Sequence, residues 1–149
     1  MKKTCLAASL FLFLLSACTG SYVYIPENTR NYTIGQIQQA TIGTPMITKR
    51  DATIIENTRW VGIAFAPGGF KTTRYYDYES TQEDLIYTGI SGNTIKMTYK
   101  QFKYDFEIPV FFQDLQYDIG RSNVIAFRQY RIQVTGANNE RIQFIVVSD

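Results

Sequence analysis

The feature that most limits the fold of this 149-residue chain is the regular alternation of apolar and polar residues in "TIKMTYKQFKYDFE", residues 94–107. Successive side chains of a β-strand point to opposite faces, so such alternation predicts a strand with one buried face. The predicted inner face consists of Ile95, Met97 and Tyr99. The predicted outer face consists of Lys96, Thr98 and Lys100. The apolar phase then shifts by one residue, which requires a bulge near Gln101 or a switch between faces.

The neighbouring segments predict hairpins. The apolar run "LIYTGI" precedes this strand and ends in Ser91-Gly92-Asn93, a turn in which glycine and asparagine tolerate positive φ. At the C-terminus, strands over 124–135 and 141–147 flank "GANNE". Their predicted inner faces are Tyr130, Ile132 and Val134 on the first arm and Ile142, Phe144 and Val146 on the second.

Five further strands are expected, at residues 33–39, 45–48, 52–56, 60–65 and 72–78, with a loop at 66–70. Residues that favour strands dominate these segments, and no long apolar period of 3.6 residues interrupts them. The predicted fold is therefore all-β: a single antiparallel β-sandwich or small barrel.

The N-terminus has the order of a secretory signal peptide. A basic start, Met1-Lys2-Lys3, precedes an apolar run over 6–15 that is shorter than the roughly 20 residues of a membrane-spanning helix. The tetrad Leu15-Ser16-Ala17-Cys18 resembles the lipobox of bacterial lipoproteins, in which diacylglycerol is attached to the cysteine before cleavage just ahead of it. We therefore expect Cys18 to be a lipid attachment site rather than a core thiol or half of a disulfide.

The lipobox interpretation divides the chain into a signal peptide (1–17), a lipidated cysteine with its tether (18–31, with one short edge strand at 22–25) and a β domain (32–149). Thr19 follows the cysteine, where aspartate is the inner-membrane retention signal of such lipoproteins, so the resemblance implies the periplasmic face of the outer membrane. Loss of Lys2 and Lys3 lowers 15 basic residues to 13, equal to the 13 acidic ones. This neutrality argues against a nucleic-acid partner.

The side-chain inventory argues against an enzyme. The chain has no histidine, which removes the commonest general base, the histidine-dependent triads and the usual zinc sites. No cofactor is expected. A carboxylate-based hydrolase stays open as an alternative, because acidic residues recur at short spacing: Asp77 with Glu79, Glu83 with Asp84, Asp105 with Glu107, and Asp114 with Asp118.

Aromatic and basic residues gather in "RWVGIAFAPGGFKTTRYYDYES", residues 59–80. Either they fill the core, or they form an exposed contact surface, since aromatic and arginine side chains dominate binding hot spots. The candidate interaction surface consists of Trp60, Phe70, Arg74, Tyr75 and Tyr76, and Phe70 is expected to be exposed in its loop.

Four segments resemble small, functionally uncharacterised lipoproteins of Gram-negative bacteria: "GTPMI" (43–47), "LIYTGISGNTIKMTYKQF" (85–102), "PVFFQDLQYDI" (109–119) and "ANNERIQFIV" (137–146). The resemblance implies a β-rich lipoprotein and carries no activity. We therefore expect a non-enzymatic accessory or protein-interaction module, anchored in the membrane by lipid and bound to an envelope protein. A small-ligand or glycan binder is the alternative, and a carboxylate-based hydrolase is the third.

Overall fold

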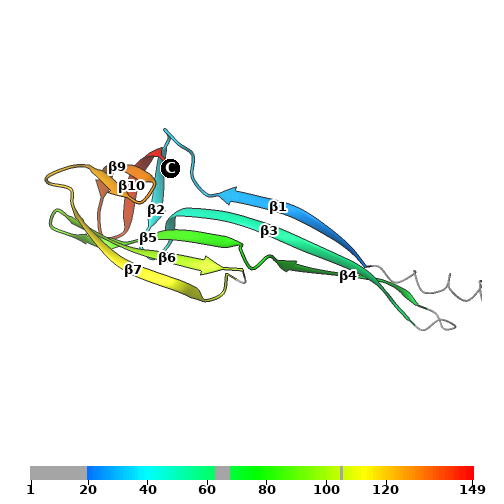
Figure 1. Cartoon of the computed structure of the whole chain (residues 1–149). Helices are drawn as coiled ribbons and strands as arrows, with labels where there is room; N and C mark the ends of the chain where they lie inside the picture. Colours follow the sequence, from blue (N-terminus) through cyan, green and yellow to red (C-terminus); the bar gives the residue numbers. More distant parts are fainter. Residues whose placement is uncertain (1–19, 63–67, 105) are drawn as a thin grey trace, which may run out of the picture. The chain divides into compact units, whose positions relative to one another are not determined.

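The computed structural model describes residues 20–62, 68–104 and 106–149, and all regular elements within these ranges are β-strands (Figure 1). The strands are β1 (Ser21–Arg30), β2 (Ile37–Thr41), β3 (Pro45–Val61), β4 (Gly69–Tyr76), β5 (Thr81–Ser91), β6 (Thr94–Lys103), β7 (Pro109–Asp118), β8 (Val124–Phe127), β9 (Tyr130–Ala137) and β10 (Arg141–Ser148). The described part of the chain has no helix long and apolar enough to span a bilayer. The predicted signal peptide and Cys18 lie outside the described residues.

The chain forms two compact units, of which the larger comprises residues 26–53 and 76–149. Its first sheet has the order β1-β3-β5-β6-β7, and its second has the order β2-β10-β9-β8. Figure 1 shows β2 beside β10, although about a hundred residues separate them in the sequence. The two antiparallel sheets do not close into a barrel, so the all-β prediction is confirmed in its sandwich form.

The core of the larger unit lies between the two sheets. The predicted inner faces are confirmed: Ile95, Met97 and Tyr99 are at most 1% exposed, whereas Lys96 is exposed. The other core side chains that the sequence assigned to inner faces are also buried, namely Tyr130, Ile132, Val134, Ile142, Phe144 and Val146. Burial of about ten such side chains at about 1.5–3 kcal/mol each stabilises a domain whose residues 20–149 contain no cysteine.

The predicted hairpin is present, and the change of apolar phase in β6 is the expected alternative of a switch between faces. Ser91 pairs with Thr94 across a two-residue turn in which Gly92 has φ of 58°, a conformation that glycine adopts without strain. The β6–β7 register shifts between Gln101 and Phe102, where the apolar phase changes in the sequence. Strand β6 itself has no extra residue, because its pairing with β5 is regular from Lys100 to Lys103, and the extra residue is Val110 of β7. Phe102 is therefore buried on the face of β6 opposite to Tyr99.

Three strand boundaries differ from the prediction. Three expected short strands lie wholly or partly within the 17-residue strand β3, because no glycine or proline interrupts residues 46–61. The expected tether with a short edge strand contains the ten-residue strand β1. The expected strand over 124–135 turns back at Arg128-Gln129 to form the β8–β9 hairpin, with Arg128 at φ of 51°.

The smaller unit includes described residues 20–25 and 54–75. Its strands are the first half of β1, the second half of β3, and β4, which pairs with β3. Most of its side chains are exposed or half-buried, and Ile55 is its buried apolar residue among those described. A small sheet of this kind leaves both faces accessible to a contact.

Two positions on strand β10 test the energetics of the core. Changing Ile142, which is fully buried, to alanine should lower the free energy of unfolding by about 2–5 kcal/mol, because it leaves a cavity between the sheets. Changing Val147, which is 48% exposed on the same strand, to alanine should alter it by no more than about 0.5 kcal/mol. Urea denaturation of both variants measures this, and equal effects would contradict the assignment of the core.

Candidate interaction surfaces

The β3–β4 hairpin of the smaller unit carries side-chain pairs on one face. The Trp60 and Phe70 rings meet edge to face with centroids 5.3 Å apart. One step along, the Thr58 and Thr72 hydroxyl oxygens are 2.8 Å apart. The third pair is an ion pair between Glu56 and Arg74. Because these contacts recur at every second residue of each strand, all three pairs share one face of the hairpin.

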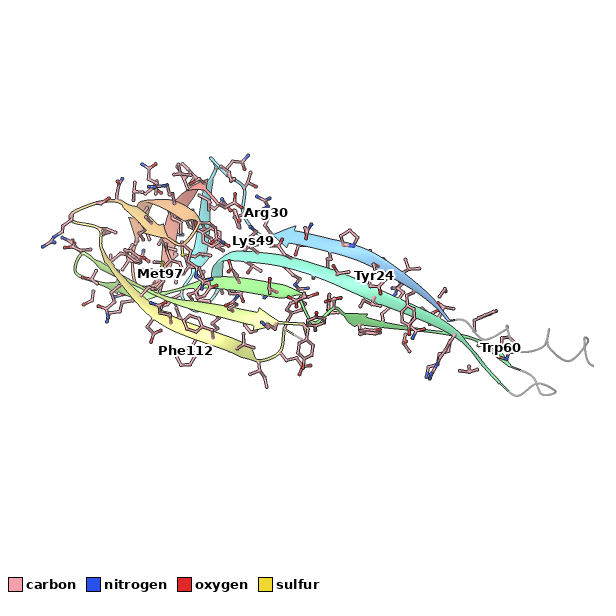
Figure 2. All side chains as sticks on the ribbon, viewed as in Figure 1. Tyr24, Arg30, Lys49, Trp60, Met97 and Phe112 are labelled. Carbon is pink, nitrogen blue, oxygen red and sulfur yellow. The ribbon has the colours of Figure 1, made fainter. Side chains whose placement is uncertain are left out.

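Trp60 is held in a defined orientation near the end of this hairpin, where Figure 2 labels it. A Cβ on Gly68 would lie 2.5 Å from Trp60 Cζ2, so only glycine leaves room for the indole ring there. Phe70 packs edge to face against the indole and is 75% exposed, while Trp60 is 47% exposed. The end of the hairpin therefore presents two preorganised aromatic rings to its surroundings.

The structure divides the five predicted interaction residues among three places. Trp60, Phe70 and Arg74 share the face just described, and Tyr75, 49% exposed, points to the opposite face because it follows Arg74 in the strand. Phe70 is exposed as expected, but it lies in strand β4 rather than in a loop. Tyr76 belongs to the larger unit. The five residues do not form a single patch.

Tyr76 is part of a polar and aromatic cluster in the larger unit. Its ring packs against Phe106 with centroids 4.7 Å apart, and the guanidinium carbon of Arg50 lies 4.4 Å from the centre of the Phe106 ring. Arg50 also donates two hydrogen bonds to the Gln82 side chain and pairs with Glu27 at 3.3 Å. These contacts satisfy the guanidinium, so the cluster ties neighbouring segments together rather than offering a free cation.

Strand β7 forms the edge of the first sheet and is the main exposed apolar feature of the larger unit. Val110 and Phe112 are 59% and 68% exposed, and Ile108 just before the strand is 73% exposed. Phe111, on the other face, is 45% exposed and lies 6.2 Å from the Tyr99 ring. Figure 2 shows Phe112 projecting from β7. This edge carries apolar side chains on both faces.

Sequence reasoning took "PVFFQDLQYDI" for a packing pattern and missed this edge. The usable signal was the loss of alternation in Val110-Phe111-Phe112, because a strand that is apolar on both faces normally lies inside a sheet with both faces covered. Natural edge strands are instead protected by charges, and β7 has no lysine or arginine. The sequence of β7 is typical of a strand inside a sheet, and only the strand order shows that β7 lies at an edge.

Glu83 joins the two sheets of the larger unit at the β8–β9 turn. Its Oε1 accepts hydrogen bonds from the hydroxyl of Tyr99 at 2.8 Å and from the guanidinium of Arg128 at 3.0 Å. Its Oε2 accepts bonds from the amide of Gln129 at 2.9 Å and the hydroxyl of Tyr130 at 3.1 Å. Arg128 lies over the Tyr99 ring at 4.5 Å, so its charge is held beside the carboxylate.

The electrostatics of this cluster favour an ionised carboxylate. Burial acts to raise the pKa of Glu83, but the hydrogen bonds from Tyr99, Gln129 and Tyr130 and the charge of Arg128 outweigh it, and the pKa is lowered. Burial, together with the hydrogen bond and charge of Glu83, raises the pKa of the Tyr99 hydroxyl. A carboxylate with both oxygens engaged and a lowered pKa is suited to holding structure, not to donating protons.

Among the described carboxylates expected for a hydrolase, Glu83, Asp84, Asp114 and Asp118 each make separate local contacts. Glu83 and Asp84 point to opposite faces of β5, and Asp84 accepts a hydrogen bond from Thr48 at 2.9 Å. Asp114 accepts a bond from Thr98 at 2.6 Å, and Asp118 pairs with Arg121 at 3.6 Å. Asp105 lies outside the described residues. Within the described ranges, no cluster of three or more acidic side chains is arranged to hold a metal ion.

Comparison of the chain with protein-family models, with curated proteins and with solved structures finds no match. The features that bear on function are therefore two exposed surfaces of the chain: the aromatic end of the β3–β4 hairpin and the apolar edge strand β7.

We call the hydrogen bonds from Tyr99, Arg128, Gln129 and Tyr130 to the carboxylate of Glu83 the Glu83 clamp. Changing Glu83 to glutamine tests this clamp through the pH dependence of the free energy of unfolding. Since the folded-state pKa is lowered, the carboxylate stabilises the fold above its ordinary pKa of about 4.3, and this stabilisation is lost as pH falls through the lowered value. At neutral pH the variant should be less stable by about 1–3 kcal/mol, and the difference from the parent should shrink below pH about 4.

The matched control is Glu140→Gln in the exposed β9–β10 turn, which should leave the free energy of unfolding within about 0.5 kcal/mol of the parent value. Denaturation across the acid range measures all three proteins. A Glu83→Gln deficit that stays constant with pH would contradict the role of the ionised carboxylate.

Proposed function

We propose that this protein is a non-enzymatic interaction module of the Gram-negative cell envelope, attached through lipid on Cys18 to the periplasmic face of the outer membrane. The larger unit binds an extended segment of an envelope protein along strand β7, and this segment is apolar where it lies beside residues 108–113. The bound segment adds a strand to the open edge of the sheet, with backbone hydrogen bonds supplying affinity and alternate side chains supplying specificity.

The observation that carries this proposal is the exposed apolar edge of β7. Over residues 108–113 the edge has no charged side chain, and Val110, Phe111 and Phe112 present apolar surface on both faces of the sheet. A strand added beside β7 would cover these side chains and pair its open backbone groups. The two acidic side chains, Asp114 and Asp118, lie in the second half of the strand, so a partner with basic residues at that end fits best.

Other features support the anchored and non-enzymatic parts of the proposal. The tetrad at residues 15–18 supports lipidation, and two or three acyl chains make attachment effectively permanent. The absence of histidine from the sequence and the full engagement of Glu83 argue against acid–base catalysis. The ligand-binding alternative is disfavoured because Tyr75 points to the face of the hairpin opposite to Trp60, Phe70 and Arg74.

Changing Cys18 to serine tests the anchor. The variant should lose incorporation of radioactive palmitate and accumulate as an unprocessed precursor, because serine lacks the thiol that forms the thioether. Its sandwich should fold unchanged, since residues 20–149 contain no cysteine. Labelling of cells followed by gel electrophoresis measures this, and normal labelling of the serine variant would refute the anchor.

Changing Phe112 to lysine tests the edge. A charge on an edge strand opposes addition of another strand, so a photo-crosslinker at position 110, which in the parent should form an adduct with an envelope protein, should lose that adduct in the lysine variant. The side chain is 68% exposed, so stability should change by no more than about 0.5 kcal/mol. Gel electrophoresis and mass spectrometry of the adducts measure the result.

The control is Ile37→Lys, which changes an exposed apolar side chain on β2, an edge strand of the second sheet. It should leave the adduct intact. An adduct that survives Phe112→Lys, or one formed with a second copy of this chain, would overturn the proposal of an envelope partner on β7.

A further inference from the structure

Gly20, the first described residue, lies directly beside strand β3. A Cβ on Gly20 would be 3.3 Å from Asn57 Oδ1, 3.4 Å from the carbonyl oxygen of Thr58 and 3.7 Å from Arg59 Cβ. All of these residues belong to the smaller unit. The start of β1 is therefore fixed next to the part of β3 that leads into the end of the hairpin.

The covalent chain limits how far this point can be from the proposed lipid anchor. Gly20 lies two positions after Cys18, and an extended chain spans at most about 3.6 Å per residue, so the two Cα atoms lie within about 7 Å of each other. A diacylglycerol thioether places the cysteine at the boundary between headgroups and acyl chains. If the anchor is as proposed, residues 57–59 are held close to that boundary.

The hairpin has the side chains of a membrane-interface contact beyond this point. Trp60 and Val61 come two and three residues after Thr58, which is at most about 10 Å along the strand. Phe70 packs on Trp60. These three side chains are 47%, 41% and 75% exposed. Tryptophan and phenylalanine favour the headgroup region, where an apolar ring body is buried and the indole N–H stays hydrated.

The charge of the smaller unit matches the same surface. Residues 20–25 and 54–75 contain three basic side chains, Arg59, Lys71 and Arg74, and one acidic side chain, Glu56. The neutral chain from residue 18 onward has 13 of each sign, so the remainder has ten basic and twelve acidic residues. The unit that begins beside the anchor is therefore the basic one, which favours an anionic lipid surface.

We infer that the face of the β3–β4 hairpin that carries Trp60 and Phe70 lies in the headgroup region of the bilayer as a second, non-covalent membrane contact. This inference rests on the proposed lipid anchor and goes beyond it. Gly68 leaves the space that keeps the indole in place. Acyl chains and hairpin together orient the smaller unit on the membrane, whereas acyl chains alone only tether it.

Trp60 is the sole tryptophan of the chain and reports directly on this contact. The full lipidated protein is reconstituted into vesicles of phosphatidylethanolamine and phosphatidylglycerol. Its Trp60 emission is compared with that of an unlipidated Cys18→Ser chain without residues 1–17, in detergent-free solution. We expect a blue shift, loss of intensity with lipids brominated near the headgroup, and reduced quenching by acrylamide. Phe70→Ser should reverse part of the shift, with vesicle flotation unchanged because the acyl chains remain.

The outcomes separate the hairpin from the anchor. Protein that floats with the vesicles while Trp60 stays accessible to acrylamide would overturn the hairpin contact and leave the anchor intact. A chain that incorporates no palmitate, as measured by labelling and gel electrophoresis, would refute both the proposed lipid anchor and this inference. A photo-crosslinker at position 70 should yield lipid adducts in the native envelope, and a discrete protein adduct would instead assign the hairpin to a protein partner.

Discussion

The structure depends on the burial of alternate side chains between two antiparallel sheets in the larger unit. Ile47, Tyr87 and Ile95 from the first sheet meet Ile132 and Phe144 from the second, and all five are at most 1% exposed. Without a cysteine in residues 20–149, no covalent cross-link supports this contact. The hydrophobic free energy of the closed core therefore has to offset the conformational entropy of ten strands by itself.

The Glu83 clamp fixes how the sheets meet at one end of that core. A buried carboxylate costs free energy unless its oxygens are hydrogen-bonded, and here donors from β6, the β8–β9 turn and β9 converge on it. The clamp explains why Arg128 adopts a left-handed conformation: the turn places its guanidinium against both Glu83 and Tyr99. Polar chemistry in this cluster supports the architecture, which leaves function to the exposed surfaces.

The two proposed contact surfaces, one in each unit, differ in chemistry. The β7 edge is apolar on both faces and has open backbone groups, which favours an added strand. The hairpin end combines aromatic rings with basic side chains, which favours a lipid interface. We propose that the smaller unit contacts the membrane and that the larger unit carries the site for a protein partner.

Local patterns in the sequence determined the strands with strong alternation: the faces of β6, β9 and β10, the turn at Gly92 and the change of face after Gln101 all follow from period two and turn chemistry. Residues 1–19 lie outside the described part of the chain, so the lipid anchor at Cys18 still rests on sequence alone. Only the tertiary structure decided that β3 runs without a break, that Tyr76 belongs with Arg50 and that β7 is an edge. The reason is physical: alternation reports which face of a strand is apolar, whereas strand order depends on contacts between distant segments that no local pattern contains.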